Sequence, residues 1–139
     1  MSKRHFDDAR SELARQFGQP PGFYDVVWRI LNSVVAAGRP AADVENAYRE
    51  MARVASFERK DPRPHLAHAL ATSLQAMKMR GVKRVAISSY AGAPDSSTCE
   101  ACRSLHGTKL DIDEALATLP IPNKCTDVGG WCRCEYAPA

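Results

Sequence analysis

The chain has 139 residues, of which 45% are hydrophobic and 25% charged, a balance that fits one folded domain and excludes disordered, collagen-like and coiled-coil compositions. The net charge is +3, but residues 1–90 hold 15 Lys and Arg against 9 Asp and Glu, whereas residues 91–139 hold 4 against 7. No apolar run approaches the roughly 20 residues needed to cross a bilayer, and the first residues lack the apolar stretch of a signal peptide. We therefore expect a cytoplasmic protein that does not contact a membrane.

Apolar side chains recur at helical spacing through the first 81 residues and predict four helices there. Three of the predicted helices cover residues 4–17, 23–37 and 40–57, and the fourth begins at Asp61 and stops at Gly81. Gly38 and Gly81 are suitable stops for the second and fourth helices. Pro40 suits the first turn of the third helix, and Asp61 followed by Pro62 predicts the N-cap and first residue of the fourth. Residues 1–81 are thus expected to form a helical body.

After Gly81 the pattern changes to an alternation rich in β-branched residues, with Val85 and Ile87 as the apolar positions, which predicts a strand over residues 82–90. Asp111, with Glu three residues later, predicts the start of a short helix that ends before Pro120. Alternation over residues 131–136 predicts a second strand. The fold class is therefore mainly α: a four-helix body followed by a small α+β tail, residues 82–139, with two short strands and one or two short helices. We expect the tail to pack with the body as one domain.

All five cysteines fall within 36 residues of the tail, and this clustering points to a metal site. They are Cys99, Cys102, Cys125, Cys132 and Cys134. Zn²⁺ is bound by four soft ligands at about 2.3 Å, and a C-x2-C turn presents two sulfurs on one side. If the C-x-C pair lies in a strand, both of its sulfurs face the same way and complete the site. A second pairing uses Cys125 and only one cysteine of the C-x-C pair.

The tail contains few large apolar side chains, so we expect that it needs a bound metal ion or another cross-link to be stable. A structural zinc ion contributes roughly 10–16 kcal/mol of apparent binding energy, against about 2–4 kcal/mol for a disulfide. A cytoplasmic location also disfavours disulfides, and inert buried thiols would not explain the clustering. We therefore expect one structural zinc ion. His106, four residues after Cys102, is a further candidate donor.

Residues 95–107, DSSTCEACRSLHG, resemble the D-S-x-T-C-x-x-C-x-x-L-x-G signature of the phage Mu F-like minor head proteins, also called head morphogenesis proteins. In that family a proline-rich stretch and a closing C-R-C follow, and residues 119–125 and 132–134 occupy the equivalent places here. The family usually ends in P-x-H-x-x-C-R-C, whereas this chain has Cys125 near the place of the histidine and an insert before Cys132. Cysteine can replace histidine as a zinc ligand. The resemblance covers residues 95–136 and implies a structural assembly module without catalysis, with phage structural or host proteins as partners and the virion as a second location.

The sequence contains no Ser-His-Asp order, P-loop, glycine-rich dinucleotide turn or H-E-x-x-H motif. The leading hypothesis is therefore a non-enzymatic, zinc-stabilised module for protein interaction. An alternative is a nucleic-acid-binding zinc protein in which basic side chains contact phosphate. The residues that would do so are Lys78, Arg80, Lys83 and Arg84, together with Lys3 and Arg4 near the N-terminus.

A third hypothesis makes Cys99 and Cys102 a thiol redox pair that follows a strand and opens a helix, although the surrounding βαβ pattern of thioredoxin-like proteins is missing. Catalytic zinc is a related alternative, in which Cys99, Cys102 and one later cysteine would leave a fourth position to water. The spare cysteine favours a closed site instead.

Overall fold

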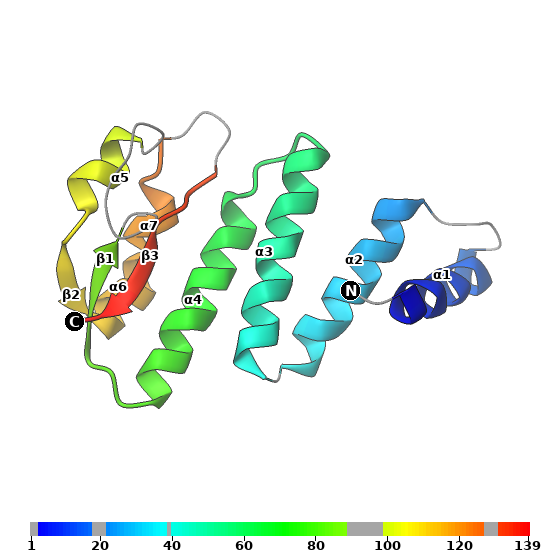
Figure 1. Cartoon of the computed structure of the whole chain (residues 1–139), viewed down its shortest axis with the longest axis horizontal. Coiled ribbons are helices and arrows are strands. Elements are labelled where there is room, and N and C mark those ends of the chain that lie inside the picture. Colours follow the sequence, from blue (N-terminus) through cyan, green and yellow to red (C-terminus); the bar gives the residue numbers. More distant parts are fainter. Residues whose placement is uncertain (1–2, 18–21, 39, 89–98, 127–130) are drawn as a thin grey trace.

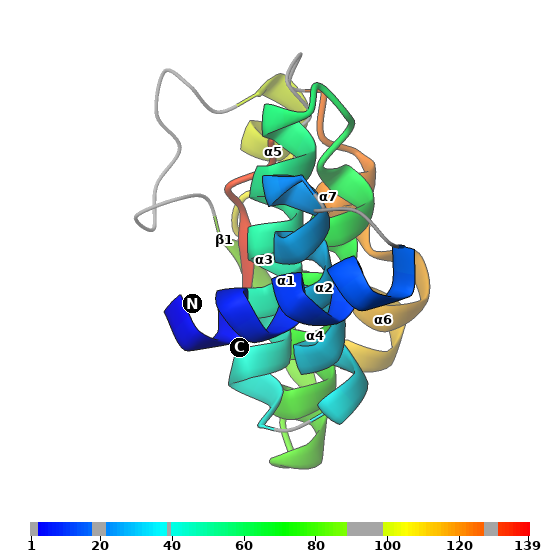
Figure 2. The same ribbon diagram turned by 90° about the vertical axis from the view of Figure 1, so that its right-hand side faces the viewer.

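A computed structural model describes residues 3–17, 22–38, 40–88, 99–126 and 131–139. Its first half consists of four helices: α1 (Lys3–Phe17), α2 (Phe23–Ala37), α3 (Ala41–Phe57) and α4 (Arg63–Met79). Helices α2, α3 and α4 stand side by side, and α1 lies across α2 (Figures 1 and 2). The four helices predicted from the apolar spacing are confirmed.

Local signals account for where these helices end. Gly38 and Gly81 adopt φ angles of 72° and 90°, in the left-handed region that favours glycine. The start of α4 differs by one residue from the prediction, because Pro62 is the N-cap and Arg63 the first helical residue. Asp61 still caps this end, since its carboxylate accepts a hydrogen bond from the Arg63 backbone N–H at 3.0 Å.

The described residues of the tail form six short elements. They are β1 (Arg84–Ser88), α5 (Glu100–Leu105), β2 (Lys109–Asp111), α6 (Ile112–Thr118), α7 (Pro120–Asn123) and β3 (Glu135–Pro138). The strands form an antiparallel sheet in the order β2-β1-β3, with Val85 opposite Leu110 and Ile87 opposite Tyr136. The mainly α architecture with a small α+β tail is confirmed, but the sheet has three strands where the sequence predicted two.

Two of the expected strand boundaries are wrong. The first strand begins at Arg84 and not at residue 82, and its predicted end at residue 90 lies outside the described part of the chain. The last strand begins at Glu135, so residues 131–134, which include the C-x-C pair, are not in a strand. Cys132 and Cys134 are nevertheless both buried, because this stretch enters the core before pairing with β1 begins.

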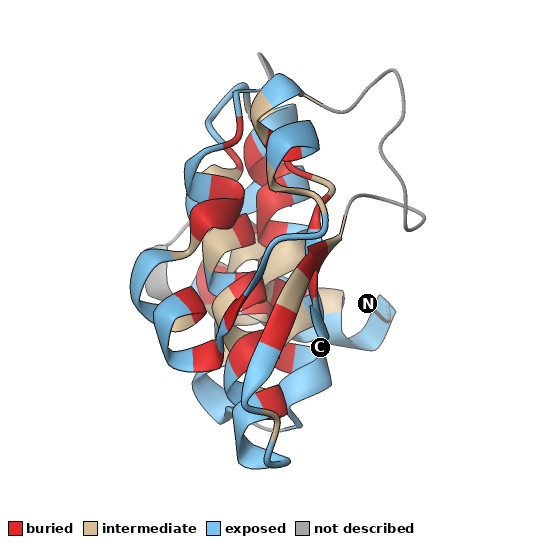
Figure 3. Cartoon of the chain, turned by 90° about the vertical axis from the view of Figure 1, so that its left-hand side faces the viewer, coloured by how far each residue is buried: buried red, intermediate tan, exposed pale blue. Residues whose placement is uncertain are grey.

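The largest hydrophobic cluster joins α4 to the tail. The buried side of α4 belongs to the same cluster as Val85 and Ile87 of β1, both fully buried, and four of the cysteines. In Figure 3, where buried residues are red, the buried positions of β1 alternate with less buried ones. Two smaller clusters hold α2 against α3 and α1 against α2. The cysteines therefore belong to the packed core that α4 shares with the tail.

Among the described residues, no helix combines the length and apolarity that spanning a membrane requires.

Candidate metal centre

The five cysteines come from three segments that meet beside the N-terminal end of α4. Cys99 is the N-cap of α5, and Cys102 lies in its first turn. Cys125 follows α7, while Cys132 and Cys134 precede β3. In Figure 1 these three segments gather at one end of the tail. Residues separated by up to 35 positions are thus brought to one place by the fold.

Two pairs of sulfur atoms lie at a separation that suits a tetrahedral metal ion. The Sγ atoms of Cys99 and Cys125 are 3.7 Å apart, and those of Cys102 and Cys132 are 3.8 Å apart. A tetrahedron with metal–sulfur bonds of about 2.3 Å has edges of about 3.8 Å. Both separations far exceed the roughly 2.05 Å of a disulfide bond, and none of the five cysteines is part of a disulfide.

The five sulfurs form two overlapping groups. Cys99, Cys102 and Cys125 have Sγ atoms within 4.8 Å of one another, and so do Cys102, Cys132 and Cys134. Cys102 belongs to both groups and therefore lies at the centre of the arrangement. Either group supplies three sulfur ligands for a metal ion, and the five sulfurs do not all lie within 4.8 Å of one another.

Burial makes this cluster an unfavourable place for charge without a compensating cation. Cys102, Cys125, Cys132 and Cys134 are each at most 4% exposed. Burial, followed by the neighbouring sulfurs, raises the pKa of the Cys102 thiol. Hydrogen bonding to the Cys134 sulfur, followed by burial, raises the pKa of Cys132. A divalent cation reverses this preference, because it binds the deprotonated thiolate directly.

The surroundings of Cys99 stabilise the thiolate form of its side chain. Partial burial raises the pKa of its thiol, but backbone N–H groups outweigh this effect and lower the pKa to about 6. Thr126 and Cys102 donate these N–H···S hydrogen bonds, each 3.4 Å long. Thiolate sulfur at neutral pH is the form that both a metal ligand and a nucleophile require.

Two contacts that the sequence did not indicate hold the Cys125 segment in place. Arg63 at the start of α4 donates from Nη1 to the Cys125 carbonyl at 3.2 Å, and its Nε donates to Asp61. Tyr136 of β3 donates its hydroxyl proton to the Ile121 carbonyl at 3.0 Å and accepts from the Ile121 N–H at 3.2 Å. Arg63 is 62 residues from Cys125, so no local spacing could have paired them.

His106 belongs to neither sulfur group. It is the C-cap of α5, and its backbone N–H bonds to the Cys102 and Arg103 carbonyls. The candidate ligand set in the described part of the chain therefore consists of cysteines.

Four of the basic residues that the nucleic-acid hypothesis used lie between the C-terminal end of α4 and the start of β1. Lys78 pairs with Asp113 at 2.6 Å, so its charge is already partly compensated. Lys78 and Lys83 line a hollow together with three carboxylates, Asp111, Asp113 and Glu114. Arg80, Lys83 and Arg84 are exposed, whereas Lys3 and Arg4 lie on α1, across the row of helices in Figure 1. The structure therefore does not gather these cations on one uninterrupted basic face.

The chain matches no protein-family model, no curated protein and no solved structure.

Proposed function

We propose that the chain is a non-enzymatic protein-interaction and assembly module whose tail is held in shape by one structural zinc ion. Cys99, Cys102, Cys125 and Cys132 are the proposed ligands, and Cys134 is the fifth, supporting cysteine. The observation that carries the proposal is the pair of Sγ separations, 3.7 Å and 3.8 Å, which fit opposite edges of a zinc–thiolate tetrahedron.

Four soft sulfur donors favour zinc over magnesium, calcium or manganese, which prefer oxygen ligands. Four protein ligands also fill a tetrahedral site, so that no position is left for a substrate or a reactive water. This is why the proposed ion is structural, and the proposed module is not an enzyme.

The zinc ion would hold together elements that are too short to be stable alone. Helix α5 has six residues, α7 has four and β3 has four. Isolated helices shorter than about 12 residues are marginal in water, and a sheet of short strands needs a packed face. Ligands at α5, after α7 and before β3 would fix these elements against α4 and leave the helical body as a rigid surface for partners.

The resemblance of residues 95–107 to the phage Mu F-like minor head proteins supports an assembly role. On this proposal the partner is a phage structural protein or a host protein, and the location is the cytoplasm or the virion. This chain has Cys125 near the place of the family's histidine. The change is compatible with metal binding, because the Sγ atoms of Cys125 and Cys99 are 3.7 Å apart.

One observation favours a second candidate function. The lowered pKa of Cys99, about 6, also suits the nucleophile of a thiol redox protein with Cys102 as its partner. Burial of Cys102, only 2% exposed, weighs against this candidate, because exchange requires access to the second sulfur.

Alkylation mapping separates the two candidates. For a zinc site, all ligand cysteines of the purified protein resist iodoacetamide at neutral pH and become reactive together when a chelator is added. For a redox pair, Cys99 reacts far faster than the other four and the chelator changes nothing. A Cys→Ser series read by zinc content then identifies the ligands: Cys102→Ser should lose the metal, and Cys134→Ser, the matched control, should retain it.

A further inference from the structure

The cysteine cluster holds more sulfur than one zinc ion uses. The proposed zinc ligands are Cys99, Cys102, Cys125 and Cys132, and Cys134 is outside that set. Cys134 nevertheless belongs to a second group of sulfurs, since the Sγ atoms of Cys102, Cys132 and Cys134 lie within 4.8 Å of one another. Its side chain interacts with those of both Cys102 and Cys132. The two groups meet at Cys102, so the arrangement is a pair of triangles that share one corner.

The second group has the dimensions of a trigonal metal site. Metal–sulfur bonds of about 2.3 Å place the three sulfurs of a planar, trigonal site about 4.0 Å apart. The Sγ atoms of Cys102 and Cys132 are 3.8 Å apart, and the Sγ atom of Cys134 closes the triangle within 4.8 Å of both. A small inward movement of the Cys134 sulfur is therefore enough to surround one ion.

The donors of the second group are sulfur alone. Within the described ranges, neither of the two groups that could hold a metal ion contains an imidazole or a carboxylate. Thiolates select soft ions, among them the cuprous ion and zinc. A second zinc ion needs a fourth ligand to complete its tetrahedron, whereas a cuprous ion is stable with trigonal thiolate coordination. The number of donors therefore favours a cuprous ion over a second zinc ion.

Charge balance favours the same ion. Cys102, Cys132 and Cys134 are each at most 4% exposed, so a change that adds net charge there is costly. A cuprous ion carries one positive charge and takes the place of one thiol proton. The S–H bond of Cys134 breaks, an S–Cu bond forms, and the proton leaves to solvent without any change of oxidation state. The net charge of the cluster is the same before and after this exchange.

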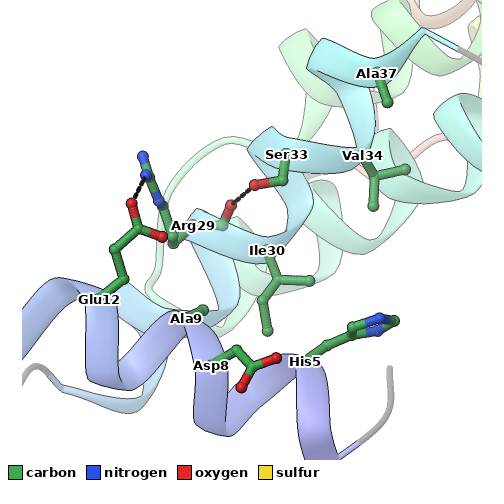
Figure 4. A pocket seen from close by; sticks show the side chains of 9 residues that line it. All are labelled: His5, Asp8, Ala9, Glu12, Arg29, Ile30, Ser33, Val34 and Ala37. Carbon is green, nitrogen blue, oxygen red and sulfur yellow. Dashed lines mark hydrogen bonds and ion pairs between the residues drawn. The ribbon is translucent and has the colours of Figure 1, made fainter.

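The hollow of about 360 Å³ between α1 and α2 offers a different set of donors. Figure 4 shows His5, Asp8 and Glu12 along it, and no cysteine is among its lining residues. Glu12 is already paired with Arg29 at 2.6 Å. Thiolates are confined to the tail, because all five cysteines of the sequence are there. A cuprous ion added to the chain is therefore expected at the cysteine cluster.

We propose that Cys102, Cys132 and Cys134 form a second metal site, which takes a cuprous ion beside the structural zinc ion. Cys102 and Cys132 bridge the two ions, and Cys134 binds copper alone. This site rests on the proposed function, because the zinc ion would hold the two bridging sulfurs near the 3.8 Å at which they lie. Cys134 is then the residue that decides whether a second ion binds.

The test adds a cuprous complex, in the absence of oxygen, to the full chain purified with zinc. Native mass spectrometry counts both metals, and competition with a cuprous chelator measures the copper affinity. We expect one copper ion per chain, with the zinc ion retained. Cys134→Ser should retain zinc and weaken copper binding at least ten-fold.

The matched control is Cys99→His, which removes one sulfur of the first group only and puts another zinc ligand in its place. Cys99 is partly exposed, so the larger imidazole has room, and the copper affinity should stay within two-fold. Thermal melts show whether either variant is unfolded. X-ray absorption at the copper edge of the unchanged chain needs no variant, and we expect three sulfur neighbours and no nitrogen or oxygen.

Displacement of zinc by copper overturns the proposal, as do nitrogen or oxygen neighbours at the copper edge. Equal weakening of copper binding by Cys134→Ser and Cys99→His overturns it too. A chain that holds no zinc before copper is added contradicts the proposed function itself. The copper edge of that metal-free chain and of its Cys134→Ser variant then decides separately whether the second group binds copper.

Discussion

The hydroxyl of Tyr136 gives a sharp test of how the tail is held together. It donates to the Ile121 carbonyl and accepts from the Ile121 N–H, in a place where Tyr136 is 6% and Ile121 0% exposed. Tyr136→Phe removes one oxygen and leaves two buried backbone groups without a partner. A buried group that loses its partner costs about 1–3 kcal/mol, so the two together should cost about 2–6 kcal/mol of the free energy of unfolding. Burial also raises the pKa of Tyr136 to about 12, so the hydroxyl is protonated throughout the neutral range.

The assay is urea unfolding of the metal-loaded protein, followed by far-UV circular dichroism. Tyr24→Phe is the matched control, because Tyr24 is 40% exposed and its change should stay within about 0.5 kcal/mol. If Tyr136→Phe costs no more than the control, the hydroxyl is not the buried link between β3 and the segment that leads to Cys125, and the reasoning about that segment fails.

Three further predictions concern the core, the metal and pH. Ile87→Ala should lower the free energy of unfolding by about 2–5 kcal/mol in the same urea assay, because Ile87 is fully buried in β1, and a loss below about 1 kcal/mol would contradict that burial. Arg63→Gln removes the donor to the Cys125 carbonyl and should weaken zinc binding roughly ten-fold in competition with a chelating dye; unchanged affinity would show that this contact does not position the ligand. Burial, followed by the charge of His68, lowers the pKa of His65 from 6.5. The unfolded chain then binds the proton more readily, so stability falls as pH drops through about 6.5, and His65→Gln should show a shallower fall; identical pH profiles would refute this.

The sequence predicted the helical body well because each helix carries its own signals. The stretch from Phe23 to Gly38 has a wide apolar stripe and a glycine stop, and the structure places α2 over Phe23–Ala37. Helix spacing is local information, readable over a few turns without knowledge of the partner surface. The same holds for β1, where Val85 and Ile87 alternate with more exposed residues.

The parts of the tail that depend on distant partners were less predictable. Strand β2 has only three residues, and nothing within Lys109–Asp111 distinguishes it from a loop until it pairs with β1. The alternation around Cys132 and Cys134 predicted that the last strand begins at residue 131, before its actual start at Glu135. Burial of Cys132 and Cys134 comes from the cysteine cluster and not from sheet pairing.

The sequence predicted which residues form the candidate site, but it did not predict which of their sulfur atoms lie next to one another. Clustering of the five cysteines in the sequence was enough to expect a common site, and their sulfurs do form two groups that share Cys102. Which sulfurs lie at tetrahedral spacing depends on the path of the chain between α7 and β3, which no spacing rule fixes. The roles of Arg63 and Tyr136 come from contacts across the fold and carry no motif.

X-ray absorption at the zinc edge of the purified full chain tests the central claim most directly. We predict one zinc ion per chain, surrounded by four sulfur atoms at about 2.3 Å and by no nitrogen or oxygen donor. Metal-free protein that keeps its fold, or an ion bound mainly by light atoms, would contradict the proposed role of these cysteines.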